Sequence, residues 1–150
     1  MRTVDYKDLA KLAGEEIGIS DWLEVTQERV NTFAEATGDF QWIHVDAERA
    51  GREMGGAIAH GYLTLSLIPL LNKSIAQVTG VDRALNYGLE KVRFINMVKV
   101  GKRIRMRSKY LSVEPKSGGL QLRTECVIEI EGEAKPACIA ETVTLFFPAV

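Results

Sequence analysis

Strict alternation between polar and apolar residues in the last third of the chain limits the fold more than any other feature. Residues 103–110 place basic side chains on one side and apolar ones on the other, and residues 120–131 do the same with acidic side chains. Such alternation predicts strands with one dry and one wet face. Turn sequences occur at Gly101-Lys102, Ser117-Gly118-Gly119 and Gly132. Together with residues 81–100 and 139–147, these segments predict an antiparallel meander of about four long strands.

The most hydrophobic segment runs from residue 59 to about residue 78. Its large apolar side chains, at positions 63, 67, 68, 70 and 71, nearly encircle a helix. This pattern predicts a helix buried on most sides, with a kink at Pro69. A sheet with one dry face and a helix that is apolar all round fit one arrangement, in which the sheet curls around the helix. The predicted fold class is therefore α+β, an antiparallel sheet wrapped around a long buried central helix.

Shorter elements are predicted in the first third of the chain. Residues 6–13 have helical spacing and are followed by Gly14, and residues 22–25 form a short strand. A helix starts after Thr26, a good N-cap, and ends at Gly38, a residue suited to the left-handed conformation that closes helices. Asp46 is placed to cap a short helix that extends through Ala50.

Length and composition indicate one domain over residues 1–150, large enough for a core of its own. A formal net charge of -1 gives no case for nucleic acid, and we expect the basic residues 103–109 to pair with acidic residues on the neighbouring strand. Cys126 and Cys138 are typical of small buried residues and lack zinc-ligand spacing. The apolar run 63–71 is too short to span a bilayer, and the first residues lack the apolar core of a signal peptide. We therefore expect a cytoplasmic protein without a membrane partner.

The chemistry is concentrated in residues 37–46. Asp39 and His44 stand five positions apart, separated by Phe40, Trp42 and Ile43 among others. This spacing aligns two side chains on neither a helix nor a strand, but a loop can bring them together. An acid and a base walled by apolar groups are suited to general acid–base catalysis. Metal coordination by Asp39, His44 and His60 has no support from spacing, and no nucleotide-binding motif is present, so no cofactor is predicted.

Each candidate also has a purely structural interpretation. Asp39 can cap the next turn, and His44 can be a hydrogen-bonded core residue. His60 can be packed and bonded to backbone rather than catalytic. The segment Asn86-Tyr87-Gly88 either contacts substrate or forms a bulge in a strand. The sequence leaves these alternatives open.

The segments Ala36-Thr37-Gly38-Asp39-Phe40-Gln41-Trp42-Ile43-His44-Val45-Asp46 and Ala59-His60-Gly61 resemble the MaoC-like family. The likeness is greatest to its R-specific enoyl-CoA hydratases and to its nodulation-protein-N-like branch. It covers nearly the whole chain, including Asn86-Tyr87-Gly88 and Lys91-Val92-Arg93-Phe94. Two departures stand out. Gln41-Trp42 replaces the Asn-Pro of many members, and Pro69 replaces a serine that some hydratases use.

The resemblance implies a hot-dog fold, a homodimer with active sites near the subunit interface, and reversible hydration of trans-2-enoyl thioesters to (R)-3-hydroxyacyl thioesters. It places the catalytic pair on Asp39 and His44 and the backbone oxyanion donor on Gly61. We expect substrate contacts from the neighbouring and strand residues His60, Tyr62, Asn86, Tyr87 and Gly88. The expected partner is an acyl-CoA or acyl carrier protein thioester. Because one fold hosts several functions, an acyl-CoA thioesterase and a non-catalytic thioester-binding subunit remain alternatives.

Overall fold

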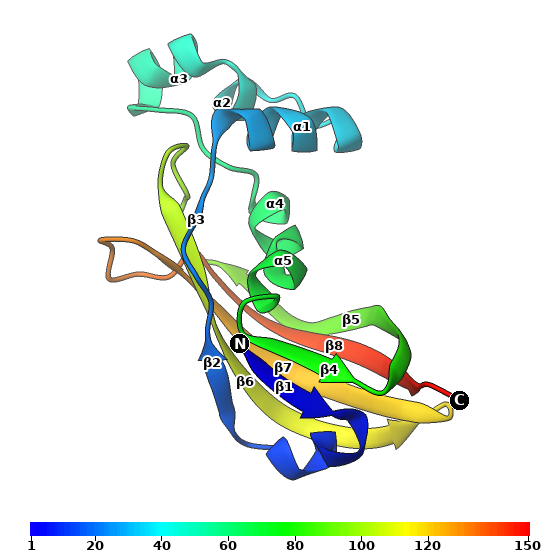
Figure 1. The fold of residues 1–150 in the computed structure, drawn as a ribbon. Coiled ribbons are helices and arrows are strands. Elements are labelled where there is room, and N and C mark those ends of the chain that lie inside the picture. The colour runs from blue at the N-terminus through cyan, green and yellow to red at the C-terminus, as the bar shows by residue number, and fades with distance from the viewer.

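The computed structural model describes residues 1–150, and its main feature is one curved antiparallel sheet (Figure 1). Its strands follow the spatial order β2-β6-β7-β8-β5, and the short strand β3 also pairs with β6. Their bounds are Glu16–Ile19 for β2, Leu23–Glu24 for β3, Val81–Phe94 for β5, Arg103–Lys116 for β6, Gly119–Ile130 for β7 and Cys138–Pro148 for β8. The long strands β6, β7 and β8 follow one another as predicted, so the alternating pattern was interpreted correctly.

The position of β5 differs from the predicted meander. β5 pairs with β8 at the far edge of the sheet instead of with β6, its neighbour in sequence. The segment after β5 is used elsewhere: Val98 and Val100 pair with the backbone of Ala59 and Ala57, and Gly101 bonds to Val25. The residues around Gly101 therefore form no hairpin between β5 and β6. Local turn chemistry could not reveal this crossover.

The buried helical segment is shorter than predicted. It consists of α4, Gly61–Ser66, and α5, Ile68–Asn72, which meet at Leu67, two residues before the predicted kink at Pro69. The prediction of a helix to about residue 78 is wrong, because Ala76–Thr79 forms strand β4 and pairs in parallel with β1, Arg2–Asp5. The N-terminal strand β1 provides hydrogen-bonding partners for this segment with its β-branched residues. The segment therefore forms a strand instead of continuing the helix.

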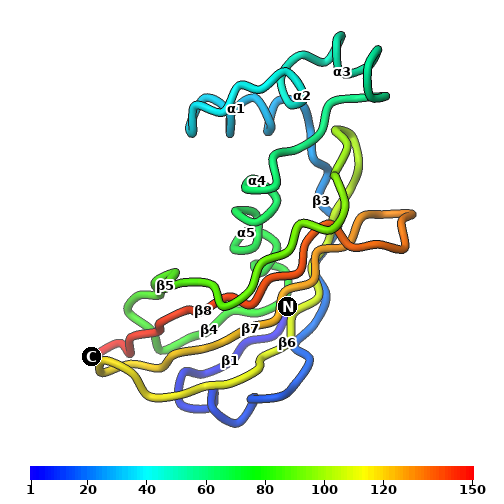
Figure 2. The backbone as a smooth tube through the Cα atoms, turned by 180° about the vertical axis from the view of Figure 1, so that it is seen from behind, coloured from blue at the N-terminus to red at the C-terminus, as the bar shows by residue number.

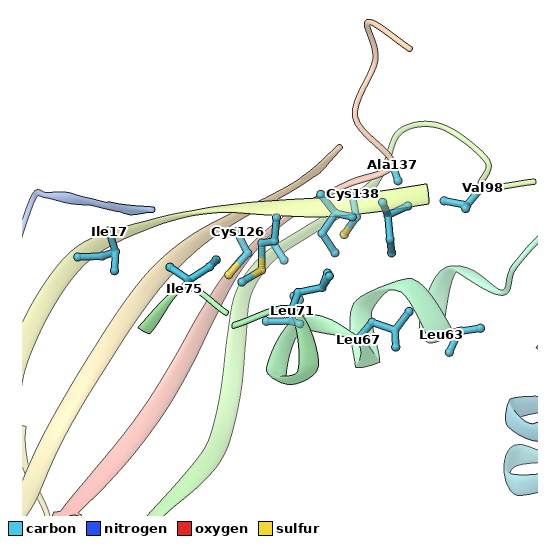
Figure 3. Close-up of a cluster of buried hydrophobic side chains, with 14 of the residues drawn as sticks. Ile17, Leu63, Leu67, Leu71, Ile75, Val98, Cys126, Ala137 and Cys138 are labelled. Carbon is cyan, nitrogen blue, oxygen red and sulfur yellow. The ribbon is translucent and has the colours of Figure 1, made fainter. Parts of the chain in front are cut away.

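Helices α4 and α5 lie on the concave face of the sheet and carry the core. Figure 3 shows Leu63, Leu67 and Leu71 spaced along these helices, opposite the strands that carry Cys126 and Cys138. Both cysteines are fully buried, as predicted. This arrangement confirms the α+β class. No helix has the length and apolar character needed to cross a membrane.

Three helices project beyond the sheet at the N-terminal end of α4 (Figures 1 and 2). They are α1, Gln27–Thr37, α2, Trp42–Val45, and α3, Ala47–Met54. The predicted caps are present: Thr26 accepts a hydrogen bond from Arg29 N–H at 3.1 Å, and Asp46 accepts one from Arg49 N–H at 3.0 Å. α3 extends past the predicted Ala50 to Met54, and the predicted first helix is a 3-10 helix over Tyr6–Leu12.

The convex face of the sheet bears the predicted ladder of opposite charges. Arg103 pairs with Glu131, and both Arg105 and Arg107 pair with Glu129. Burial opposes the charge of Glu129, but hydrogen bonds from the two arginines outweigh it and hold the pKa of Glu129 below its usual value. The charges of Arg103, Arg105 and Arg107 are therefore largely neutralised by acidic side chains of the neighbouring strand.

Candidate active site

The end of α1 sets the position of Asp39. Gly38 closes the helix with φ 83°, in the left-handed conformation, and its N–H donates to Ala34 O. The chain then turns sharply, and Asp39 Oδ1 accepts a hydrogen bond from Gln41 N–H at 3.3 Å. The capping role considered for Asp39 is thus present. This long hydrogen bond uses one carboxylate oxygen of Asp39, so the other oxygen is available to accept a proton.

His44 is held by a backbone carbonyl. It is 6% exposed, and its Nδ1 lies 2.7 Å from Ile58 O. A carbonyl can only accept, so Nδ1 carries the proton and Nε2 of the neutral ring has a free lone pair. Gln27 Nε2 also donates to His44 O at 2.8 Å, which ties α2 to α1. His44 therefore offers a fixed acceptor at Nε2.

His60 is packed against the same group. It is 3% exposed, and its Nε2–H donates to Asp39 O at 2.9 Å. Its ring stacks on that of His44 with centroids 3.8 Å apart, while Phe33 covers it at 4.9 Å. His60 Nδ1 is buried and has no hydrogen-bond partner. This geometry matches the backbone-bonded role considered for His60, which orients Asp39 and His44 and lines neither of the two main cavities.

Asp39 lies in the loop after α1, His44 on the short helix α2 rather than in the predicted loop, and His60 just before α4, and one ligand-type atom of each lies within 4.8 Å of the others. A metal ion requires the lone pairs of both imidazoles to converge on a single point. The two rings are stacked with 24° between their planes, and one nitrogen of each already lies within hydrogen-bond distance of a backbone carbonyl. We expect this cluster to hold a water molecule, since the sequence spacing of the three residues does not specifically support metal coordination.

Gly61 is the first residue of α4, and its N–H has no partner within the chain. A Cβ at this position would lie 3.2 Å from the ring of Phe94, a tight contact, so glycine keeps the space between the amide and that ring open. Gly61, His44 and Phe94 line one cavity of about 260 Å³. The amide donor and the histidine acceptor therefore face a common space.

A second cavity, of about 680 Å³, lies further along the same helices, between α4, α5 and the sheet. Gly61 and Thr64 face the first cavity, while Leu65, Ile68 and Asn72 face the second. These positions follow one helical face, and on β5 Phe94 lines the first cavity while Leu89 lines the second. Both cavities thus lie along one seam between the helices and β5.

The remaining predicted substrate residues are dispersed. Asn86 and Gly88 line the larger cavity. Tyr87 lines neither cavity; its hydroxyl accepts a hydrogen bond from Lys116 Nζ at 3.1 Å. Tyr62 is 71% exposed and contacts Phe94 edge-on. The β5–β8 register shifts between Asn86 and Gly88, so the bulge considered for this segment is present.

Sequence analysis missed several cavity residues. Phe94 and residues 95–98 wall the smaller cavity, and Tyr110, Thr124 and Thr142 line the larger one. The last three were detectable in principle, because they are hydroxyl residues on the apolar side of their strands. Cys126 also lines the larger cavity, but burial raises its pKa to about 12. Burial likewise raises the pKa of Cys138 to about 11, so neither thiol is a ready nucleophile.

Comparison with known proteins shows which family this chain belongs to. The model of the MaoC like domain matches residues 8–128. The chain belongs to the MaoC-like family. It is 50% identical to 3-hydroxyacyl-thioester dehydratase Z of Mycobacterium tuberculosis H37Rv over 149 residues, covering 97% of this chain and 99% of that protein. It is 40% identical to Nodulation protein N of Rhizobium leguminosarum bv. viciae, covering 97% and 92%. It is an enzyme of the hydratase and dehydratase class.

Solved structures agree with the fold. R-hydratase PhaJ1 from Pseudomonas aeruginosa in the unliganded form superposes with a TM-score of 0.74 at 21% identity, covering 91% of this chain and 83% of that one. The (R)-hydratase from A. caviae gives 0.68 at 22% identity, covering 88% and 94%. The predicted hot-dog fold is confirmed.

Proposed function

We propose that this MaoC-like enzyme hydrates trans-2-enoyl thioesters reversibly to (R)-3-hydroxyacyl thioesters, using Asp39, His44 and the Gly61 amide. The observation that carries the proposal is the placement of a buried histidine acceptor and an unpaired amide donor on one cavity, with Asp39 beside the histidine. The 50% identity to a protein named 3-hydroxyacyl-thioester dehydratase Z supports the substrate class.

In the proposed mechanism, one water molecule donates its hydrogens to the Asp39 carboxylate and to His44 Nε2. Its oxygen lone pair is then directed at C3 of the enoyl group. Asp39 acts mainly as the base that takes a proton as the C3–O bond forms. The electrons of the double bond shift to the thioester oxygen as an enolate. The proton taken by Asp39 then passes to C2, either directly or by way of His44 Nε2, so the pair regains its starting protonation state.

The Gly61 amide is proposed to hold the thioester oxygen. Its free N–H lies at the positive end of α4, where negative charge on an oxygen is favoured. A donor aimed at an oxyanion lowers the barrier by about 3 kcal/mol in comparable sites. The absence of a side chain at Gly61 lets the substrate approach beside Phe94.

The larger cavity is proposed to take the acyl tail. It continues from the reacting end along the same helical face, and its volume of about 680 Å³ lies in the range of small-molecule sites. The carrier, CoA or acyl carrier protein, would remain outside the smaller cavity. A non-catalytic subunit would not need an oriented acid–base pair beside the smaller cavity.

The assembly is proposed to be a homodimer formed through β5. This edge strand is 14 residues long, and its side chains are almost all exposed, including Leu85, Tyr87 and Leu89. A long apolar sheet edge is a template for pairing with another chain. Pairing with a second copy would also cover Phe94, which borders the site and is 47% exposed.

The activity is tested with crotonyl-CoA, the shortest convenient substrate. We expect the absorbance of the conjugated double bond to fall to a hydration equilibrium with no release of free thiol. Thiol release with an intact double bond would instead establish the thioesterase alternative. Neither signal, together with tight binding of the thioester, would establish the non-catalytic alternative.

A further inference from the structure

The floor of the larger cavity contains a row of hydroxyl groups that the proposed reaction does not use. The hydroxyl row consists of Tyr110 on β6, Thr124 on β7 and Thr142 on β8. Tyr110 is the register partner of Thr124, and Thr124 is that of Thr142, so the three side chains share one face of the sheet. All three line the cavity. They place a band of polar groups across an otherwise apolar chamber.

No protein group satisfies this row. Tyr110 is 3% exposed and Thr124 is 8% exposed, and neither hydroxyl forms a hydrogen bond within the chain. Thr142 has only a contact of 4.0 Å with the Cys126 thiol. Their oxygens are not among the fully enclosed unpaired atoms of the chain, so they open onto the cavity, where a polar ligand atom can replace the water that they would otherwise bind. Burial raises the pKa of Tyr110, so its hydroxyl remains a donor. The row is therefore arranged to meet a polar atom inside the cavity.

The register of the sheet gives the distance from the reacting end. Phe94, which contacts the Gly61 position, pairs with Cys138, whereas the hydroxyl row ends at Thr142 on the same strand. Four residues along a strand correspond to about 14 Å. An extended chain advances about 1.2 Å per bond, so this distance corresponds to roughly ten carbons and a hydrogen bond.

We propose that the hydroxyl row recognises an oxygen function near the far end of the acyl tail, and that the enzyme prefers medium-chain enoyl thioesters hydroxylated about ten carbons from the thioester. This inference rests on the proposed function for the reacting end and adds a substrate class to it. A purely apolar chamber would have the opposite preference, because a tail hydroxyl would be buried without a partner.

The test compares 10-hydroxy-trans-2-decenoyl-CoA with trans-2-decenoyl-CoA, two substrates that differ only in the terminal hydroxyl. We expect kcat/KM to be about tenfold higher for the hydroxylated substrate. Tyr110→Phe and Thr142→Val should each reduce this ratio several-fold, while Tyr6→Phe, which changes a tyrosine outside both cavities, should leave it unchanged. A ratio of one or below, or equal effects of Tyr110→Phe on both substrates, would overturn the inference.

A binding measurement separates this inference from the proposed reaction. Calorimetric Kd values for the saturated analogues 10-hydroxydecanoyl-CoA and decanoyl-CoA require no catalysis. Tighter binding of the hydroxylated analogue, lost in Tyr110→Phe, supports the hydroxyl row even if neither enoyl substrate is hydrated. Equal or weaker binding of the hydroxylated analogue would mean that the hydroxyl row binds only water. This result would contradict the inference.

Discussion

The two cavities along the α4–β5 seam are built by different means. Beside the smaller one, loop carbonyls fix the imidazole rings: Ile58 O holds His44, which lines the cavity, and Asp39 O holds His60, which stacks on His44. In the larger one, regular strands and helices form the walls, and the hydroxyl row has no backbone partner. Chemistry needs fixed orientation, whereas a tail needs volume and a few placed polar groups. Changes in the first cavity should therefore affect rate for all substrates, and changes in the second should affect selection among them.

The largest effect is expected from the acid–base pair. Asp39→Asn and His44→Asn should each lower kcat/KM for crotonyl-CoA by about 10²- to 10⁴-fold, because they remove a proton acceptor. His44→Asn retains an amide N–H near Ile58 O, so the melting temperature should change little. The control is Asp46→Asn, at an N-cap outside the site, which should retain activity. Wild-type turnover in both site variants would contradict the comparison between the cavities.

A change at the amide should have the next largest effect. Gly61→Ala places a methyl group 3.2 Å from the Phe94 ring, which displaces the substrate from the N–H. We expect kcat to fall about a hundredfold for short and long substrates alike, since misplacement by about 1 Å has this effect. Gly51→Ala on α3, where a Cβ would meet nothing within 4 Å, serves as the matched control. A loss confined to long substrates would assign Gly61 to the tail cavity instead.

Filling the larger cavity should alter substrate selection. Leu65 on α4 lines this cavity and not the smaller one. Leu65→Phe should lower kcat/KM for trans-2-decenoyl-CoA by roughly tenfold while changing that for crotonyl-CoA by less than about twofold. Steady-state kinetics with both substrates measures the difference. An equal loss on both would mean that the two cavities do not divide the substrate as proposed.

The smallest effect is expected on the convex face, away from both cavities. Glu129→Gln should lower the free energy of unfolding by about 1 kcal/mol near neutral pH and leave activity unchanged. The folded state lowers the pKa of Glu129, so its contribution is present above the unfolded-state pKa and is lost as pH falls through the folded-state pKa. Urea titrations of both proteins should therefore converge in acid. A constant difference at all pH values would contradict this assignment.

Local signals in the sequence were sufficient for the strands and caps. Alternation located β6 and β7, and the caps at Thr26, Gly38 and Asp46 are where side-chain chemistry placed them. The order of β5 in the sheet and the pairing of β4 with β1 were not predictable in this way. Both depend on partners distant in sequence, about which a local pattern carries no information.

The same distinction applies to the site. The spacing of Asp39 and His44 suggested convergence in a loop, and the structure brings these side chains together. The sequence did not indicate that His60 would bond to Asp39 O or that Phe94 would face Gly61. Asn86 and Tyr87 were grouped because they are adjacent, but only Asn86 lines a cavity. Neighbours on a strand face opposite ways unless a bulge intervenes, so adjacency alone could not assign their contacts.

The central claim is that Asp39 and His44 act as one unit on one water molecule. A double-mutant cycle of Asp39→Asn and His44→Asn, measured as kcat/KM for crotonyl-CoA, tests it most directly. If the pair acts as a unit, the double variant should be about as slow as the slower single variant. Losses that multiply would show two independent contributions and would contradict the shared-water mechanism.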